Sequence, residues 1–185
     1  MPDFLIPFIA IGLAELGDKT QIAIFCLASK TNKYLQLIVG VTLAFVVVDG
    51  LAIILGDIIS NQIPTNYIKI ISGFVFIIFG IVTLLNSKKD EDAKCDLKKP
   101  FLSGFSLILI SEMGDKTQIA SGLFATRYNP ILVFVAAISS LLILSLMAVF
   151  LGRFIFMRLK RKTISYLSGI IFIIIGGIIL LTKSG

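Results

Sequence analysis

The sequence predicts an all-α integral membrane protein whose six transmembrane helices form two inverted three-helix repeats. Three observations support this prediction: an apolar composition, six apolar runs long enough to cross a membrane, and a nine-residue motif that occurs twice. Hydrophobic residues make up 57% of the 185 residues. A soluble domain of ordinary composition carries less apolar surface than this.

The predicted spans follow from the length of the apolar runs. About 20 apolar residues in a helix cross the hydrocarbon core, and a helix satisfies its backbone polar groups internally. The first run has no basic segment before it and carries one copy of the motif, so we interpret it as a span and not as a signal peptide. The six runs are approximately 4–28, 35–59, 66–86, 101–126, 130–151 and 163–183.

The repeated motif divides the chain. It reads Glu-Leu-Gly-Asp-Lys-Thr-Gln-Ile-Ala at residues 15–23 and Glu-Met-Gly-Asp-Lys-Thr-Gln-Ile-Ala at residues 112–120. We expect a first three-helix repeat at 1–86, a charged cytoplasmic linker at 87–100 and a second three-helix repeat at 101–185. Because each repeat has an odd number of spans, the second must cross the membrane in the opposite sense. Secondary transporters are often built this way, with the substrate site near the midplane between the repeats.

The basic residues are distributed unevenly over the predicted loops. The loops after the first, third and fifth spans carry 12 of the 17 Lys and Arg residues, the opposite side carries 3, and the other two lie within spans. The positive-inside rule therefore predicts that both termini are outside. We attribute the net charge of +6 to this topology and expect the lipid bilayer, not nucleic acid, as the partner. Cys26 and Cys95 would then face the cytoplasm, where no disulfide is expected.

Each motif copy places carboxylates in the middle of an apolar run, where charges are costly and usually functional. If each span is one continuous helix, Glu15 shares a face with Asp18, and Glu112 shares a face with Asp115. Two antiparallel helices would bring these four carboxylates together near the midplane. The polar side chains that accompany them are Thr20, Gln21, Thr117 and Gln118.

The motif glycines, Gly17 and Gly114, permit either close helix contact or a local unwinding that frees carbonyl oxygens. The four carboxylates exceed the two motif lysines in number, so a negative cluster in low dielectric should bind a cation or protons. Oxygen ligands favour hard divalent ions such as Ca²⁺, Mn²⁺ or Mg²⁺. The chain has no histidine and only two cysteines, and we expect no resident cofactor. Protons and metal would compete for the same oxygens, which is the basis of cation/proton antiport.

The sequence leaves the roles of three charged residues open. Lys19 and Lys116 either form ion pairs within their own helices, snorkel toward an interface, or replace the metal as an internal cation when it is absent. Asp49, inside the second predicted span, is an extra ligand, a proton carrier or a group in a core hydrogen bond.

The strings Glu-Leu-Gly-Asp-Lys-Thr and Glu-Met-Gly-Asp-Lys-Thr resemble the two Glu-x-Gly-Asp-(Lys/Arg)-(Thr/Ser) signatures of the GDT1 (UPF0016) family. The resemblance covers the whole chain and implies export of Mn²⁺ or Ca²⁺ against protons. The short termini and linker fit a member from a prokaryotic plasma membrane. By this resemblance, the cation-coordinating residues are Glu15, Asp18, Glu112 and Asp115, supported by Thr20, Thr117, Gln21 and Gln118.

Two other classes of function stay open on the residues alone. One is an exporter of another small solute, such as an amino acid, although crowded carboxylates leave little room for it. The other is an intramembrane enzyme that uses the Gly-Asp carboxylates, although a protease dyad does not explain the duplicated Glu, Lys and Gln. We therefore expect a transporter and not an enzyme. The sequence does not choose between Mn²⁺ and Ca²⁺, nor does it give the proton stoichiometry or decide whether the chain forms a homodimer.

Overall fold

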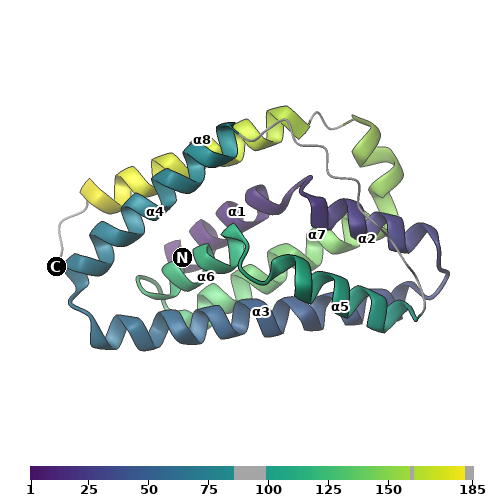
Figure 1. The fold of residues 1–185 in the computed structure, drawn as a ribbon, viewed down its shortest axis with the longest axis horizontal. Coiled ribbons are helices and arrows are strands. Elements are labelled where there is room, and N and C mark those ends of the chain that lie inside the picture. The colour runs from purple at the N-terminus through teal and green to yellow at the C-terminus, as the bar shows by residue number, and fades with distance from the viewer. Residues whose placement is uncertain (86–98, 159–160, 182–185) are drawn as a thin grey trace.

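The computed structural model describes residues 1–85, 99–158 and 161–181, with only the backbone for 152–158 and 161–165. Every regular element among these residues is an α-helix (Figure 1), which confirms the all-α prediction for this part of the chain. In order, the helices are α1 (Pro2–Glu15), α2 (Lys19–Ser29), α3 (Tyr34–Gln62), α4 (Thr65–Leu85), α5 (Pro100–Glu112), α6 (Lys116–Ala125), α7 (Pro130–Arg158) and α8 (Arg161–Leu181).

The first and fourth apolar runs are each broken into two helices within the motif. The break between α1 and α2 is at residues 16–18, and the break between α5 and α6 is at residues 113–115. Gly17 has a φ angle of 74° and Gly114 one of 84°. This left-handed region suits glycine, which lacks a Cβ. Of the two possibilities that the motif glycines left open, local unwinding is the one that occurs.

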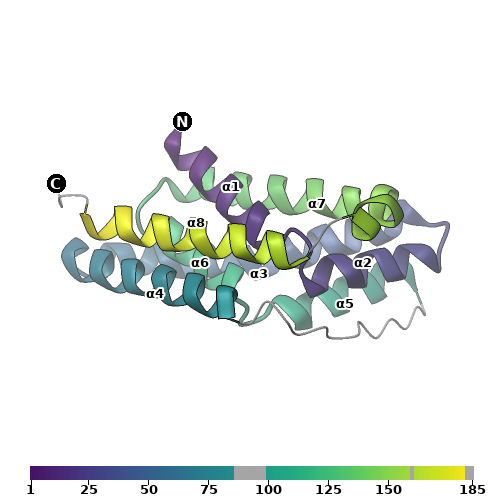
Figure 2. The same cartoon turned by 90° about the horizontal axis from the view of Figure 1, so that it is seen from above.

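Each broken helix packs mainly on a long helix from the other half of the chain. α1 and α2 lie against α7, whereas α5 and α6 lie against α3. The two long helices also contact each other, and α4 packs along α8 beside this core (Figures 1 and 2). Because of this exchange of partners, the two halves of the chain interlock.

Glycines on α3 allow this close packing. A Cβ on Gly40 would overlap the backbone of Phe101 in α5, and a Cβ on Gly56 would overlap the backbone of Gly122 in α6. Small residues let helix backbones approach in the same way in many membrane proteins. Gly40 and Gly56 thus allow α5 and α6 to lie close against α3 on both sides of the break between them.

Helix lengths and surfaces support an integral membrane protein. Three helices are long and apolar enough to cross a membrane: α3, α4 and the part of α7 at Pro130–Leu151. Shorter apolar helices occur at Pro100–Glu112 and Tyr166–Leu181. Large apolar side chains such as Leu51, Ile54 and Phe74 are exposed on the outer faces, as expected for helices in contact with lipid.

Cys26, in α2, is disulfide-bonded, and its partner lies outside the described residues. The expectation that this cysteine would form no disulfide is therefore wrong. Disulfides persist mainly in oxidising compartments. The expectation had followed from the predicted cytoplasmic position of this cysteine, where disulfides are rare.

Candidate cation site

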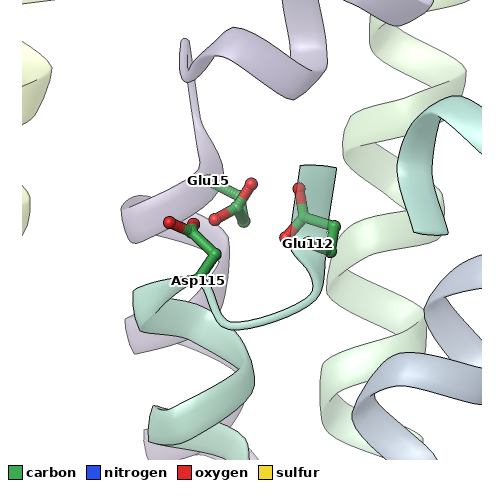
Figure 3. A group of neighbouring side chains, drawn as sticks. All are labelled: Glu15, Glu112 and Asp115. Carbon is green, nitrogen blue, oxygen red and sulfur yellow. The ribbon is translucent and has the colours of Figure 1, made fainter. Parts of the chain in front are cut away.

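The two motif copies bring three carboxylates together next to their helix breaks. Glu15 is the last residue of α1, Glu112 the last of α5, and Asp115 directly precedes α6. One oxygen from each lies within 4.8 Å of the others, and the three side chains face one another (Figure 3). Glu15 is 0% exposed and Glu112 is 3% exposed. The chain thus encloses a group of carboxylate oxygens drawn from both motif copies.

Among the residues that the structure describes, Glu15 has no hydrogen-bond partner for either carboxylate oxygen. The nearest cation is the Lys116 ammonium group, with Nζ 4.0 Å from Glu15 Oε1. Burial of an uncompensated carboxylate is costly, so such a group needs a proton or a cation close by. Asp115 Oδ2 is also buried without a hydrogen bond. These free oxygens are suited to ligating a hard cation.

Asp18, the fourth predicted carboxylate, lies beside this group. It caps the start of α2, where its Oδ1 accepts a hydrogen bond of 2.8 Å from the backbone N–H of Lys19. Its Oδ2 pairs with the ammonium group of Lys116. Lys116 therefore stands between Asp18 and the other carboxylates.

The two motif threonines both bind Glu112. The hydroxyl of Thr20 donates to Glu112 Oε1, across the two copies. The hydroxyl of Thr117 donates to Glu112 Oε2 at 3.3 Å. Both threonines are buried. Glu112 thus has a donor on each oxygen, whereas Glu15 has none, so the two copies are not equivalent.

The two motif glutamines also differ. Gln118 Oε1 accepts a hydrogen bond of 2.6 Å from the backbone N–H of Gly114, and its Nε2 donates to the Val48 carbonyl at 3.4 Å. Gln118 therefore ties the broken segment to α3. Gln21 is buried and its Nε2 has no partner.

The motif lysines occupy different environments. The Lys116 ammonium group lies 3.5 Å from Asp115 Oδ2, in addition to its contacts with Asp18 and Glu15. The Lys19 side chain is exposed and forms no ion pair within the described part of the chain. The helix break removes the i to i+4 geometry that an ion pair between Lys19 and Glu15 requires.

A hydrogen bond outside the motif links α3 to α6. The Ser121 hydroxyl donates to Asp49 Oδ1 at 2.7 Å, and both side chains are buried. Sequence reasoning singled out Asp49 but missed Ser121. The available signal was the position of Ser121, three residues after Gln118 and therefore on the same face of α6.

A known protein family matches most of the chain. The profile of the family described as "Divalent cation/proton antiporter GDT1" matches residues 3–91 and 100–185. The chain belongs to the GDT1 family. The resemblance predicted from the motifs is confirmed, and because the GDT1 family consists of transporters, the prediction of a transporter and not an enzyme is also confirmed.

Individual relatives of the chain are distant in sequence. The chain is 30% identical over 118 residues to a Vibrio cholerae protein named "Putative manganese exporter", an alignment that covers 64% of this chain and 59% of that protein. It is 28% identical to "GDT1-like protein sll0615" of Synechocystis, over 91% of this chain and 92% of that protein. It is 36% identical to "Divalent cation/proton antiporter GDT1" of Saccharomyces cerevisiae, over 42% of this chain and 28% of that protein. No solved structure matches the chain.

Proposed function

We propose that this chain exports a divalent cation, Mn²⁺ or Ca²⁺, in exchange for protons through the carboxylates of both motif copies. The observation that carries the proposal is the convergence of Glu15, Glu112 and Asp115, whose oxygens lie within 4.8 Å of one another. Glu15 contributes two buried oxygens without hydrogen bonds. A divalent cation would satisfy these oxygens and compensate their charge.

The remaining predicted residues have supporting roles in this proposal. Asp18 adds a fourth carboxylate at the edge of the site. Thr20 and Thr117 orient Glu112 through their hydroxyl groups. Gln118 holds the break in place, and Gln21 offers an amide oxygen.

Proton coupling follows from the same oxygens. Closely spaced carboxylates in low dielectric cannot all stay ionised without a cation, so protons replace the metal when it leaves. Each carboxylate then carries either metal or proton, but not both. A carrier with this property exchanges the two kinds of ion.

Mn²⁺ and Ca²⁺ both accept oxygen ligands, and the name of the Vibrio cholerae relative favours Mn²⁺. The second candidate, export of another small solute such as an amino acid, is disfavoured because three carboxylates from the two motif copies crowd the same position. A larger substrate would need both space and positive charge there.

For the membrane arrangement, we propose six spans formed by α1–α2, α3, α4, α5–α6, α7 and α8, as two inverted repeats. The opposite directions of the two broken helices support this arrangement (Figure 1). In this arrangement, the chain lies in a prokaryotic plasma membrane with both termini outside. The linker at 87–100, most of which is outside the described residues, is then in the cytoplasm. The arrangement is compatible with a homodimer. The distribution of 12 against 3 basic residues supports this orientation. Cytoplasmic labelling of a tag on either terminus would reverse this orientation.

The test of the function is metal uptake into proteoliposomes under an imposed pH gradient, with Mn²⁺, Ca²⁺ and Mg²⁺ compared. Accumulation of one ion that stops when the gradient is dissipated would establish antiport and name the substrate. Uptake should weaken as the pH on the substrate-facing side falls, because protons occupy the same oxygens. A rate that stays flat between about pH 5 and 8, the range in which perturbed carboxylates titrate, would indicate a uniporter. No movement of any of the three ions would favour the other-solute exporter.

A further inference from the structure

Lys116 lies within the carboxylate group of the candidate cation site. Its ammonium nitrogen pairs with Asp18, lies 3.5 Å from Asp115 Oδ2 and lies 4.0 Å from Glu15 Oε1. Two of these partners, Glu15 and Asp115, belong to the three residues whose oxygens converge. The ammonium group therefore uses the same oxygens that a divalent cation would need.

The equivalent residue of the first copy shows that the sequence of the motif does not impose this position. Lys19 follows the same Gly-Asp pair and also begins a helix, yet its side chain is exposed. The difference arises from tertiary contacts, since Lys116 meets carboxylates of both copies and Lys19 meets none within the described residues.

The backbone does not favour a cation where Lys116 lies. Lys116 is the first residue of α6, and the N-terminus of a helix carries partial positive charge that repels an ammonium group. Its position therefore depends on the carboxylates. Once another cation compensates them, the flexible four-carbon stem of the lysine can carry the ammonium group toward the 23% of its side-chain surface that is already exposed.

We propose that Lys116 is the internal counter-ion of the cation-free carrier, and that the incoming divalent cation displaces its ammonium group from Glu15 and Asp115. This inference rests on the proposed function, because it concerns what occupies the same site between transport cycles. The lysine compensates the carboxylates without being transported. It also sets the affinity for the cation, since every binding event must break its ion pairs.

The experiment uses the full-length protein in detergent and titrates it with Mn²⁺ or Ca²⁺ by calorimetry. The Lys116→Gln variant should bind the cation at least roughly tenfold more tightly, because no paired ammonium group has to be displaced. The matched control is Lys19→Gln, which removes the same charge from the equivalent position of the other copy and should bind like the wild type. Lys116→Arg keeps the charge and should not show the gain in affinity.

A second measurement follows the lysines of the wild-type protein directly. Amine labelling with mass spectrometry should show Lys116 protected without metal and labelled more rapidly with saturating Mn²⁺, while Lys19 reacts equally in both conditions. This readout holds even if Lys116→Gln does not fold. Unchanged labelling of Lys116, or a variant that binds no more tightly than the wild type, would overturn the inference and leave the proposed function intact. If the wild type binds neither ion, the proposed function fails and the inference fails with it.

Discussion

Thr20 of the first motif copy donates its hydroxyl hydrogen bond to Glu112 of the second copy. The two residues are 92 positions apart in the chain, and the bond joins the start of α2 to the end of α5. The bond makes the two motif copies one structural unit, since a side chain from one copy orients a carboxylate from the other.

Removal of the Thr20 hydroxyl tests whether this hydrogen bond between the motif copies matters for cation binding. Thr20→Val keeps the shape of the side chain but leaves Glu112 Oε1 without its donor. A hydrogen bond to a charged group contributes about 1.5–3 kcal/mol, so cation affinity should fall roughly tenfold or more. Binding is measured by calorimetry, with Thr20→Ser expected to restore most of the loss.

Thr42→Val is the matched control for this prediction. Thr42 lies in α3, and its buried hydroxyl has no hydrogen-bond partner in the described part of the chain. The replacement should therefore leave cation binding unchanged. Equal losses in the Thr20 and Thr42 variants would mean that the effect comes from packing and not from the bond to Glu112.

The carboxylates themselves should be essential for transport. Glu15→Gln and Asp115→Asn keep the size of the side chains but remove a charge from the converging group, so Mn²⁺ uptake into proteoliposomes should fall to the level of empty vesicles. Asp57→Asn, on α3 outside this group, is the control and should retain transport. Wild-type rates in Asp115→Asn vesicles would exclude a site shared between the copies.

The backbone break in the second motif should require glycine. Gly114 has a φ angle of 84°, and a Cβ there would meet nothing within 4 Å. Gly114→Ala therefore introduces strain without a clash and should cost about 1–2 kcal/mol of stability. The thermal unfolding midpoint in detergent and the rate of transport should both fall.

Gly177→Ala provides the comparison for the break. A Cβ on Gly177 also meets nothing within 4 Å, but this glycine lies in α8 with ordinary helical geometry. Alanine is the better helix former, so this variant should be as stable as the wild type or more so. If Gly114→Ala were equally well tolerated, the left-handed conformation would not be needed for function.

The bond between Ser121 and Asp49 should stabilise the contact of α6 with α3. Ser121→Ala leaves the buried Asp49 carboxylate without this donor, which should cost about 1–3 kcal/mol. Ser145→Ala is the control: Ser145 is equally buried but donates to the Leu141 carbonyl of its own helix. Thermal unfolding of both variants in detergent checks the difference. If both variants had similar thermal unfolding midpoints, the bond to Asp49 would not contribute specifically to the packing of α6 on α3.

Much of the candidate site could be predicted from the sequence. Charged residues in an apolar run are rare enough to stand out, and their duplication pointed to Glu15, Glu112 and Asp115 without any structure. The helix break was harder to predict, because a glycine inside an apolar run is compatible with a continuous helix, a kink or an unwound segment. Periodicity therefore placed Asp18 on a common face with Glu15, a geometry that the break at Gly17 removes.

The sequence by itself determined the class of the protein, the duplication and the kinds of polar side chain in the motif, because these depend on composition and on residue identity. The tertiary structure decided how the surroundings of equivalent residues in the two motif copies differ. Lys19 and Lys116 have the same neighbours in sequence, yet only Lys116 lies among the carboxylates. The physical reason is that α2 packs on α7 whereas α6 packs on α3. The same motif sequence is therefore surrounded by different side chains in the two copies.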